Sequence, residues 1–162
     1  MRPKHKIKLD IYDKTVEILS FATAAWLIWL VFRYYPELPG RVPSHFNITG
    51  EVDAYSTKSS FLVLPVIGLA IFFSLQILNH FPHIFNYPKQ ITTENALRQY
   101  TLATKLIRMI NLILILAFAF ITYRTILIAL QESSGLPISF TFLFLGSTGG
   151  ILVMYIWKMK NP

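Results

Sequence analysis

The chain has 162 residues, of which 54% are hydrophobic and 14% are charged, and its net charge is +7. Soluble domains carry about 25% charged residues, whereas here the uncharged stretches 18–32, 59–88, 109–123 and 133–157 together hold 85 residues. A soluble core of this size cannot bury so much apolar chain, which argues against a water-soluble enzyme, a disordered chain and a nucleic-acid-binding domain.

The sequence predicts an all-α membrane protein with four transmembrane helices. A membrane helix needs about 20 mostly apolar residues, and four segments come close to this length, at about residues 15–32, 60–80, 106–127 and 137–157. The first segment is followed by bulky residues and not by a signal-peptide cleavage site. We therefore expect it to remain in place as the first span of a single membrane domain, residues 1–162.

The distribution of basic residues predicts the orientation. Eleven Lys and Arg residues lie in the N-terminal segment, the 81–108 connection and the C-terminus, against three in the 33–59 loop. Basic residues accumulate on the cytoplasmic side. We therefore expect a plasma-membrane protein with both termini in the cytoplasm and the 33–59 loop outside. The basic N-terminus favours contact with the lipid bilayer and not with nucleic acid.

The outer loop, residues 33–59, concentrates polar groups and turn formers. Its three prolines and two glycines prevent a helix through most of it, and residues 43–47 and 52–55 are able to pair as a short β-hairpin. His45 could act as a general base oriented by Asp53. Asn47, Gly50 and Asp53 are also ordinary turn formers, so a catalytic, a binding and a purely structural role all stay open.

The polar residues of the loop do not follow a known metal-binding pattern. His45, Glu51 and Asp53 lack the spacing of a zinc or calcium motif, and the chain has no cysteine. We therefore expect no metal site and no cofactor.

The cytoplasmic connection, residues 81–105, contains a second expected helix. Thr92 or Thr93 is a suitable N-cap, so a helix starting at about residue 92 would continue into the third span. At this side of the membrane Glu17 is expected to pair with Lys105 or Arg108.

Arg124 is the most informative single charge in the spans. It lies 18 residues after residue 106, or about 27 Å along a helix, which places it near the outer headgroups. One interpretation is that its side chain simply extends to the interface. The sharper hypothesis is a clamp in which Arg124 pairs with Asp53 or Glu51 and holds the outer loop.

The fourth span contains two glycines at helical contact spacing. Gly146 and Gly150 form a GxxxG sequence, which permits close helix packing. Packing within the bundle and dimerisation explain it equally well, so the sequence leaves the oligomeric state open.

The outer loop carries a recognisable motif. Leu38 and Pro39 are followed by six residues at the spacing LPxxxPxHxNxxGxxDxxxxK, namely Pro43, His45, Asn47, Gly50, Asp53 and Lys58. This motif resembles that of a bacterial and archaeal multi-pass membrane domain of unknown function, which also opens the immunity and signal-transduction proteins of the Sdp toxin system. The resemblance implies a helical membrane protein that recognises a ligand or toxin at its outer face.

Three functions remain open at this point. The first is non-enzymatic recognition of an external peptide or toxin, with relay to a soluble regulator. The second is a membrane-embedded enzyme that acts on lipid or peptide through His45 and Asp53. The third is a small permease or transporter subunit, although the spans carry no charge at mid-depth, where ion carriers usually keep one.

Overall fold

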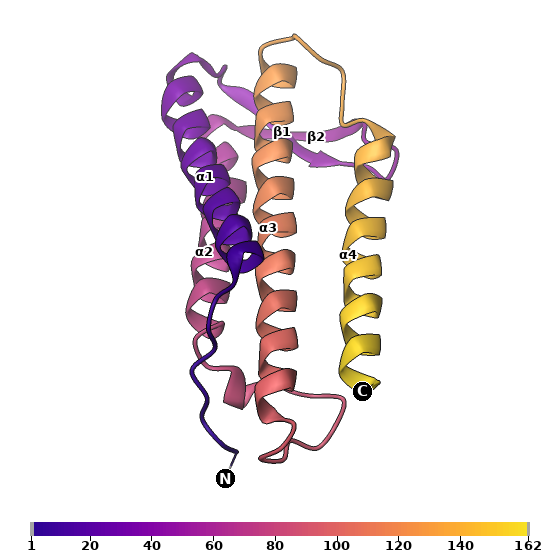
Figure 1. The fold of residues 1–162 in the computed structure, drawn as a ribbon. Coiled ribbons are helices and arrows are strands. Elements are labelled where there is room, and N and C mark those ends of the chain that lie inside the picture. Colours follow the sequence, from indigo (N-terminus) through magenta and orange to yellow (C-terminus); the bar gives the residue numbers. More distant parts are fainter. Residues whose placement is uncertain (1, 162) are drawn as a thin grey trace.

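The computed structural model describes residues 2–161 and contains four long helices with one β-hairpin (Figure 1). The helices are α1 (Ile11–Tyr34), α2 (Val63–Leu78), α3 (Ala96–Ala129) and α4 (Ile138–Lys160), and the strands are β1 (Arg41–Phe46) and β2 (Val52–Thr57). Four helical segments are long and apolar enough to cross a membrane. The predicted fold class, four membrane helices with a hairpin between the first two, is confirmed, and the chain is a multi-pass membrane protein.

Three short 3₁₀ helices join the main elements: η1 (Tyr35–Glu37), η2 (Lys58–Leu62) and η3 (Pro82–Ile84). The 16 residues of α2 rise only about 24 Å, which is less than the roughly 30 Å of hydrocarbon in a bilayer. Because η2 leads directly into α2, the helical segment Lys58–Leu78 has 21 residues and reaches the length of a span.

The first helix begins earlier than hydropathy indicates. Asp10 and Asp13 form a reciprocal cap, in which Asp13 N–H donates to Asp10 Oδ1 at 2.9 Å and Asp10 N–H donates to Asp13 Oδ2 at 3.1 Å. This capping box satisfies two backbone donors that a helix start leaves unpaired. α1 therefore begins at Ile11, although its strongly apolar part begins only near residue 15.

The third helix begins later than expected. Neither Thr92 nor Thr93 is the N-cap, because α3 starts at Ala96 and Asn95 stands at the cap without capping through its side chain. Asn95 stabilises the preceding turn instead: its Oδ1 accepts from Thr92 N–H at 3.0 Å and its Nδ2 donates to the Gln90 carbonyl at 2.9 Å. The expected start near residue 92 is corrected to 96, and from there α3 runs for 34 residues without a break.

Helix α3 is the centre of the molecule, and α1, α2 and α4 pack around it (Figure 1). The middle of the bundle is an apolar cluster of five buried residues: Ala24, Leu27, Phe72, Ile115 and Ala119. A second cluster, nearer the hairpin, joins Val42 of β1 and Phe61 of η2 to Leu30, Leu38 and Ile126. The hairpin is thus packed onto the same bundle that it connects.

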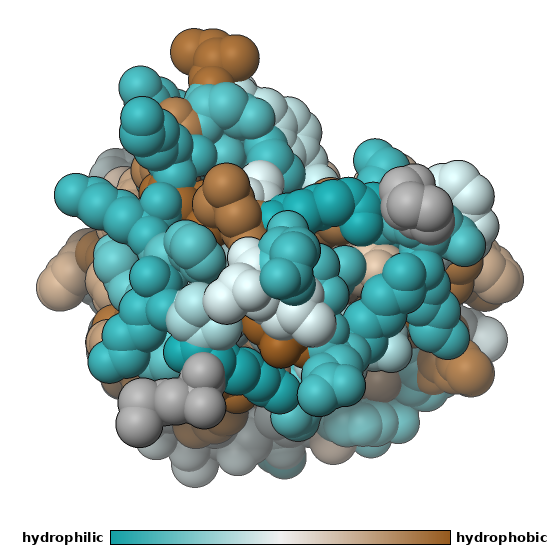
Figure 2. Space-filling model, turned by 60° about the horizontal axis from the view of Figure 1, so that its bottom comes forward, coloured by the Kyte–Doolittle hydropathy of each residue, from teal (hydrophilic) through white to brown (hydrophobic). Residues whose placement is uncertain are grey.

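Both termini lie at the end of the bundle opposite the hairpin (Figure 1). We call these two ends the hairpin end and the terminal end. Hydrophilic side chains cover much of the terminal end (Figure 2). The long sides of the helices expose many large apolar residues, as expected for surfaces that face lipid.

The glycines of α4 do not pack against the bundle. A Cβ atom added to Gly146 or Gly150 would meet no atom within 4 Å, so of the two interpretations of the GxxxG sequence the contacts do not support packing within the bundle. Helix α4 contacts α3 through larger side chains, including Phe140, whose ring lies 4.8 Å from that of Phe120. Dimerisation through these glycines stays a prediction.

Candidate functional site at the hairpin end

The hairpin is shaped by a tight turn at residues 47–51. Asn47 Oδ1 accepts hydrogen bonds from the backbone N–H groups of Thr49 at 3.0 Å and Glu51 at 2.9 Å. Gly50 has φ +88°, a left-handed conformation that residues with a Cβ rarely adopt. Asn47 and Gly50, two of the motif residues, therefore build the turn itself.

His45 and Asp53 face each other across the two strands. His45 Nδ1 lies 2.6 Å from Asp53 Oδ1, and the two side chains are 68% and 44% exposed. Irregularities in the strand register at Pro43–His45 and His45–Phe46 set His45 opposite Ala54. Nδ1 faces the carboxylate, and His45 Nε2 has no hydrogen-bond partner within residues 2–161. The pair can therefore offer a ring nitrogen of fixed orientation to a ligand.

Lys58 closes the base of the hairpin. Its Nζ donates to the Pro36 carbonyl at 3.0 Å and lies 5.1 Å from the centre of the Tyr35 ring. Its backbone N–H donates to the Gly40 carbonyl at 3.0 Å. Lys58 thus joins the segments that enter and leave the hairpin, which is a structural role.

Arg124 holds the α3–α4 connection. Its Nε donates to the Gly135 carbonyl at 3.0 Å, and its Nη2 is bonded to the same carbonyl and to Ser133 Oγ. Within residues 2–161 it forms no pair with Asp53 or Glu51, so the expected direct clamp is corrected. The connection lies between Arg124 and the hairpin. Its Gly135 carbonyl is the hydrogen-bond acceptor for the guanidinium.

The connection in turn holds the tip of the hairpin. Leu136 N–H donates to the Gly50 carbonyl at 2.8 Å, and Glu51 forms a bridge with Gly135. A Cβ at Gly50 would collide with the Leu136 carbonyl. Arg124 therefore acts on the loop through a short chain of contacts. Sequence reasoning missed residues 133–136, because a serine and glycine turn carries no signal for its partner.

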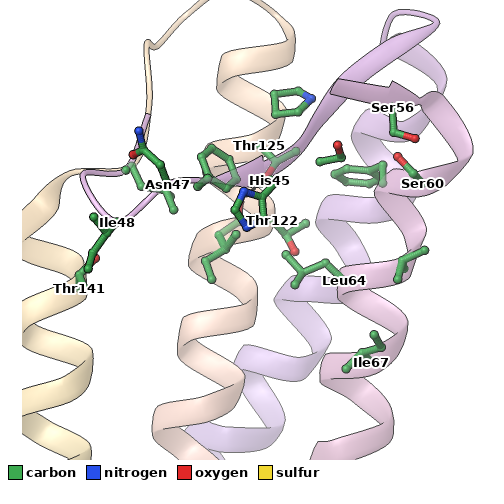
Figure 3. A pocket seen from close by; sticks show the side chains of 18 residues that line it. His45, Asn47, Ile48, Ser56, Ser60, Leu64, Ile67, Thr122, Thr125 and Thr141 are labelled. Carbon is green, nitrogen blue, oxygen red and sulfur yellow. Dashed lines mark hydrogen bonds between the residues drawn. The ribbon is translucent and has the colours of Figure 1, made fainter. Parts of the chain in front are cut away.

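A cavity of about 640 Å³ lies beneath the hairpin, between η2, α2, α3 and the start of α4 (Figure 3). Its polar wall includes Ser44, His45 and Asn47 from the hairpin region, and its apolar wall includes Leu64 and Ile67 from the second span. The cavity is therefore amphipathic, with hydrogen-bonding groups on the hairpin side and aliphatic side chains along the spans.

A buried polar atom in the wall of this cavity is also unsatisfied. Thr122 of α3 lines the cavity and is 0% exposed, and its Oγ1 has no hydrogen-bond partner within residues 2–161. Buried polar groups in proteins are nearly always paired. Thr122 therefore leaves an unpaired hydroxyl in the cavity wall, and sequence reasoning did not single it out.

A cluster of charged side chains lies at the terminal end, between α1 and α3. Arg108 Nε donates to Glu17 Oε1 at 2.8 Å, and Lys105 Nζ lies 2.5 Å from Asp10 Oδ2 and 3.3 Å from Asp13 Oδ2. Asp13, 1% exposed, is enclosed by this network. The hydrogen bond from Lys105, together with that from the Asp13 backbone, lowers the pKa of Asp10 to about 2.

The part of the chain that includes the hairpin matches a known protein family. Residues 21–69 match the family described as Domain of unknown function (DUF1648). The match covers less than half of the chain, and it includes most of α1, the hairpin, η2 and the start of α2. No curated protein and no solved structure matches the chain. The chain is thus similar to that family in the segment that builds the hairpin side of the cavity.

Proposed function

We propose that this protein resides in the plasma membrane with its hairpin end outside and both termini in the cytoplasm, and that it recognises an amphipathic peptide at its outer face without catalysing a reaction. The 11-to-3 distribution of basic residues supports the orientation. The N-terminal and C-terminal segments, which are both basic, lie with the 81–95 segment at the terminal end (Figure 1).

The cavity beneath the hairpin is the observation that carries the proposal. Ligand cavities measure about 300–1,000 Å³ and combine apolar walls with a few polar groups, and this one has about 640 Å³. Apolar side chains of a peptide would pack against Leu64 and Ile67. Its polar groups would meet His45 at the rim, and Thr122 Oγ1 would gain a partner.

The His45–Asp53 pair fits recognition of a polar group. Asp53 fixes the ring so that Nε2 is the free nitrogen. A hydrogen bond to such an oriented group contributes about 1 kcal/mol to binding. In this proposal Asp53 is a positioning residue and His45 is the residue that contacts the ligand.

The resemblance to Sdp-type immunity proteins supports an external peptide as the ligand. Helix α3 provides a continuous path between the cavity and the opposite end of the bundle, because it carries Thr122 near one end and begins at Ala96 near the other. A shift of α3 on binding would reach the connecting segment before it, where a soluble regulator could bind.

Site-specific photocrosslinking tests this proposal. The photoreactive residue p-benzoyl-phenylalanine replaces either Ile67, which lines the cavity, or its neighbour Val66, which is 62% exposed and lies outside it. Intact cells are then treated with an Sdp-type toxin peptide and irradiated. We expect a peptide adduct from position 67 and none from position 66. Equal adducts, or none at either position, would contradict recognition of such a peptide in this cavity.

A membrane enzyme is the second candidate, and the 2.6 Å contact between His45 and Asp53 favours it, since an oriented histidine is a common general base. However, no group of three or more potential metal-ligating His, Cys, Asp or Glu side chains occurs within residues 2–161, and His45 is not bonded to a serine hydroxyl there. The two functions differ in their response to His45→Ala. An enzyme loses a turnover signal completely, whereas a recognition protein loses about five-fold in affinity.

A further inference from the structure

A second cavity, of about 530 Å³, lies at the terminal end of the bundle. It is enclosed by the N-terminal segment, α1, the end of α2 and the first half of α3. Its charged and polar lining comes from all four of these elements and includes His5, Lys6, Glu17, Asn79, His80 and Arg108. Its position, far from the hairpin, separates it from the ligand site proposed above.

The N-terminal segment is fastened in place over this cavity. Arg2 donates to the carbonyls of His83 and Phe85 at 3.2 and 2.6 Å, and Tyr100 Oη donates to the Pro3 carbonyl at 3.0 Å. These contacts fix the chain just before His5 and Lys6, so that Lys6 lies in the cavity wall. The neighbouring Lys8 is exposed and does not line the cavity.

Arg108 brings a buried cation to the same wall. Its side chain is 8% exposed, its Nε is bonded to Glu17, and its Nη1 is 3.4 Å from Asp13. Its Nη2 has no hydrogen-bond partner within residues 2–161. The surroundings are electropositive overall, because residues 2–17 with Lys105 and Arg108 contain seven Lys and Arg against three carboxylates. Much of this face is hydrophilic (Figure 2).

The end of α2 supplies an unpaired acceptor. Asn79 is 7% exposed; its Nδ2 donates to the Thr104 carbonyl at 3.3 Å, while its Oδ1 has no partner within residues 2–161. An acceptor buried in this way needs a donor such as a hydroxyl group. His80 is oriented by a 2.9 Å contact of its Nδ1 with the Gln76 carbonyl, which leaves Nε2 for a ligand.

We propose that this cavity binds a phosphate ester that also carries a hydroxyl group. The phosphate oxygens would accept hydrogen bonds from Lys6 and from Arg108 Nη2, and the hydroxyl would donate to Asn79 Oδ1. Basic cavities between membrane helices are suited to anionic lipid headgroups, and a glycerophosphate headgroup combines both groups. A soluble phosphate ester offers the same chemistry, so the experiment must separate the two sources.

Lipid binding to the purified full chain tests the inference by native mass spectrometry. The probes are short-chain phosphatidylglycerol, phosphatidylethanol, which has the same charge but no hydroxyl, and phosphatidylcholine. We expect phosphatidylglycerol to bind about five-fold more tightly than phosphatidylethanol, as one hydrogen bond accounts for, and phosphatidylcholine to bind most weakly. Phosphatidylglycerol that binds no better than phosphatidylcholine would overturn the proposal.

Matched variants show whether the cavity is responsible. Lys6→Gln should weaken phosphatidylglycerol binding about five-fold, whereas Lys8→Gln, on the same segment but outside the cavity, should weaken it less than two-fold. Asn79→Leu should remove the preference for phosphatidylglycerol over phosphatidylethanol, and thermal unfolding checks that this variant is folded. Equal losses for the two lysine variants would show general surface attraction and overturn the site.

Competition with glycerol 3-phosphate identifies the source of the ligand. Displacement of the lipid at millimolar concentration assigns the cavity to soluble esters as well, and failure to displace it assigns the cavity to lipid. In both cases the Lys6→Gln effect must be present. The result is independent of the peptide proposed for the hairpin end, whose crosslinking at position 67 does not involve this cavity.

Discussion

His45 is the one motif residue whose side chain has a free functional atom at the rim of the hairpin-end cavity, whereas Asn47 and Lys58 are engaged in holding the loop together. The motif residues that build the loop are thus distinct from the residue that is free to contact a ligand. Its turn needs an acceptor at position 47 and a left-handed residue at position 50, and its base needs a cation at position 58. In the proposed recognition, the contact with the ligand is made by His45, the residue that these interactions leave free.

Arg124 holds the α3–α4 connection through its guanidinium group. Arg124→Gln removes the charged donor that holds the Gly135 carbonyl, so residues 133–136 and the hairpin tip should become more mobile. We expect a loss of stability of about 1–3 kcal/mol and faster cleavage of this loop by added protease. Glu132→Gln, at an exposed position on the same connection, is the control and should leave cleavage unchanged. Unchanged cleavage of Arg124→Gln would show that the guanidinium does not hold the loop.

The ion pair between Asp10 and Lys105 should make the stability of the protein depend on pH. The Lys105 ammonium lowers the pKa of Asp10 from 3.8 to about 2, so its stabilising charge is fully present above about pH 4 and is lost as the pH falls through about 2. Asp10→Asn keeps a good helix cap but removes the charge. In thermal unfolding in detergent, the variant should be less stable than the wild type at pH 7 and should approach it near pH 2. A difference that is constant with pH would contradict the assignment.

The number of spans and the hairpin can be predicted from the sequence, whereas the exact starts of the helices cannot. Long apolar segments and the prolines and glycines of the 33–59 loop determine that there are four spans and a hairpin, because hydropathy and backbone restriction are local properties. The exact starts of α1 and α3 are not predictable in this way, because α1 begins at the reciprocal Asp10–Asp13 cap and α3 begins only after the turn that the Asn95 side chain stabilises. The His45–Asp53 pairing follows from facing strands, whereas the partner of Arg124 depends on a loop conformation that no local pattern encodes.

Gly68 of α2 lies in close contact with Phe118 of α3. A Cβ at this position would lie 2.7 Å from Cγ and 2.8 Å from Cβ of Phe118, so Gly68 permits α2 and α3 to approach closely. Gly68→Ala should destabilise the protein by about 1–3 kcal/mol through overpacking. Gly146→Ala, where a Cβ meets no atom within 4 Å, is the matched control and should leave the monomer as stable as the wild type. Unfolding in mixed micelles measures both, and equal effects would contradict the close contact.

Two dissimilar cavities lie at opposite ends of the bundle. The hairpin-end cavity combines hydroxyl, amide and imidazole groups with aliphatic walls, whereas the polar lining of the terminal-end cavity includes two cations, the carboxylate of Glu17, amides and imidazoles. Between them lies the apolar cluster of Ala24, Leu27, Phe72, Ile115 and Ala119. The arrangement suits a protein that meets different chemistry at each membrane surface, with α3 shared by both sites.

The orientation of the bundle is the claim on which the proposed recognition depends, and the absence of cysteine allows a direct measurement. Single cysteines are introduced as Ile48→Cys, at the exposed tip of the hairpin, and as Lys8→Cys, near the N-terminus. Intact cells are then treated with a membrane-impermeant maleimide. We expect labelling at position 48 in intact cells and at position 8 only after the membrane is permeabilised. Labelling of position 8 in intact cells, with position 48 protected until permeabilisation, would contradict this orientation.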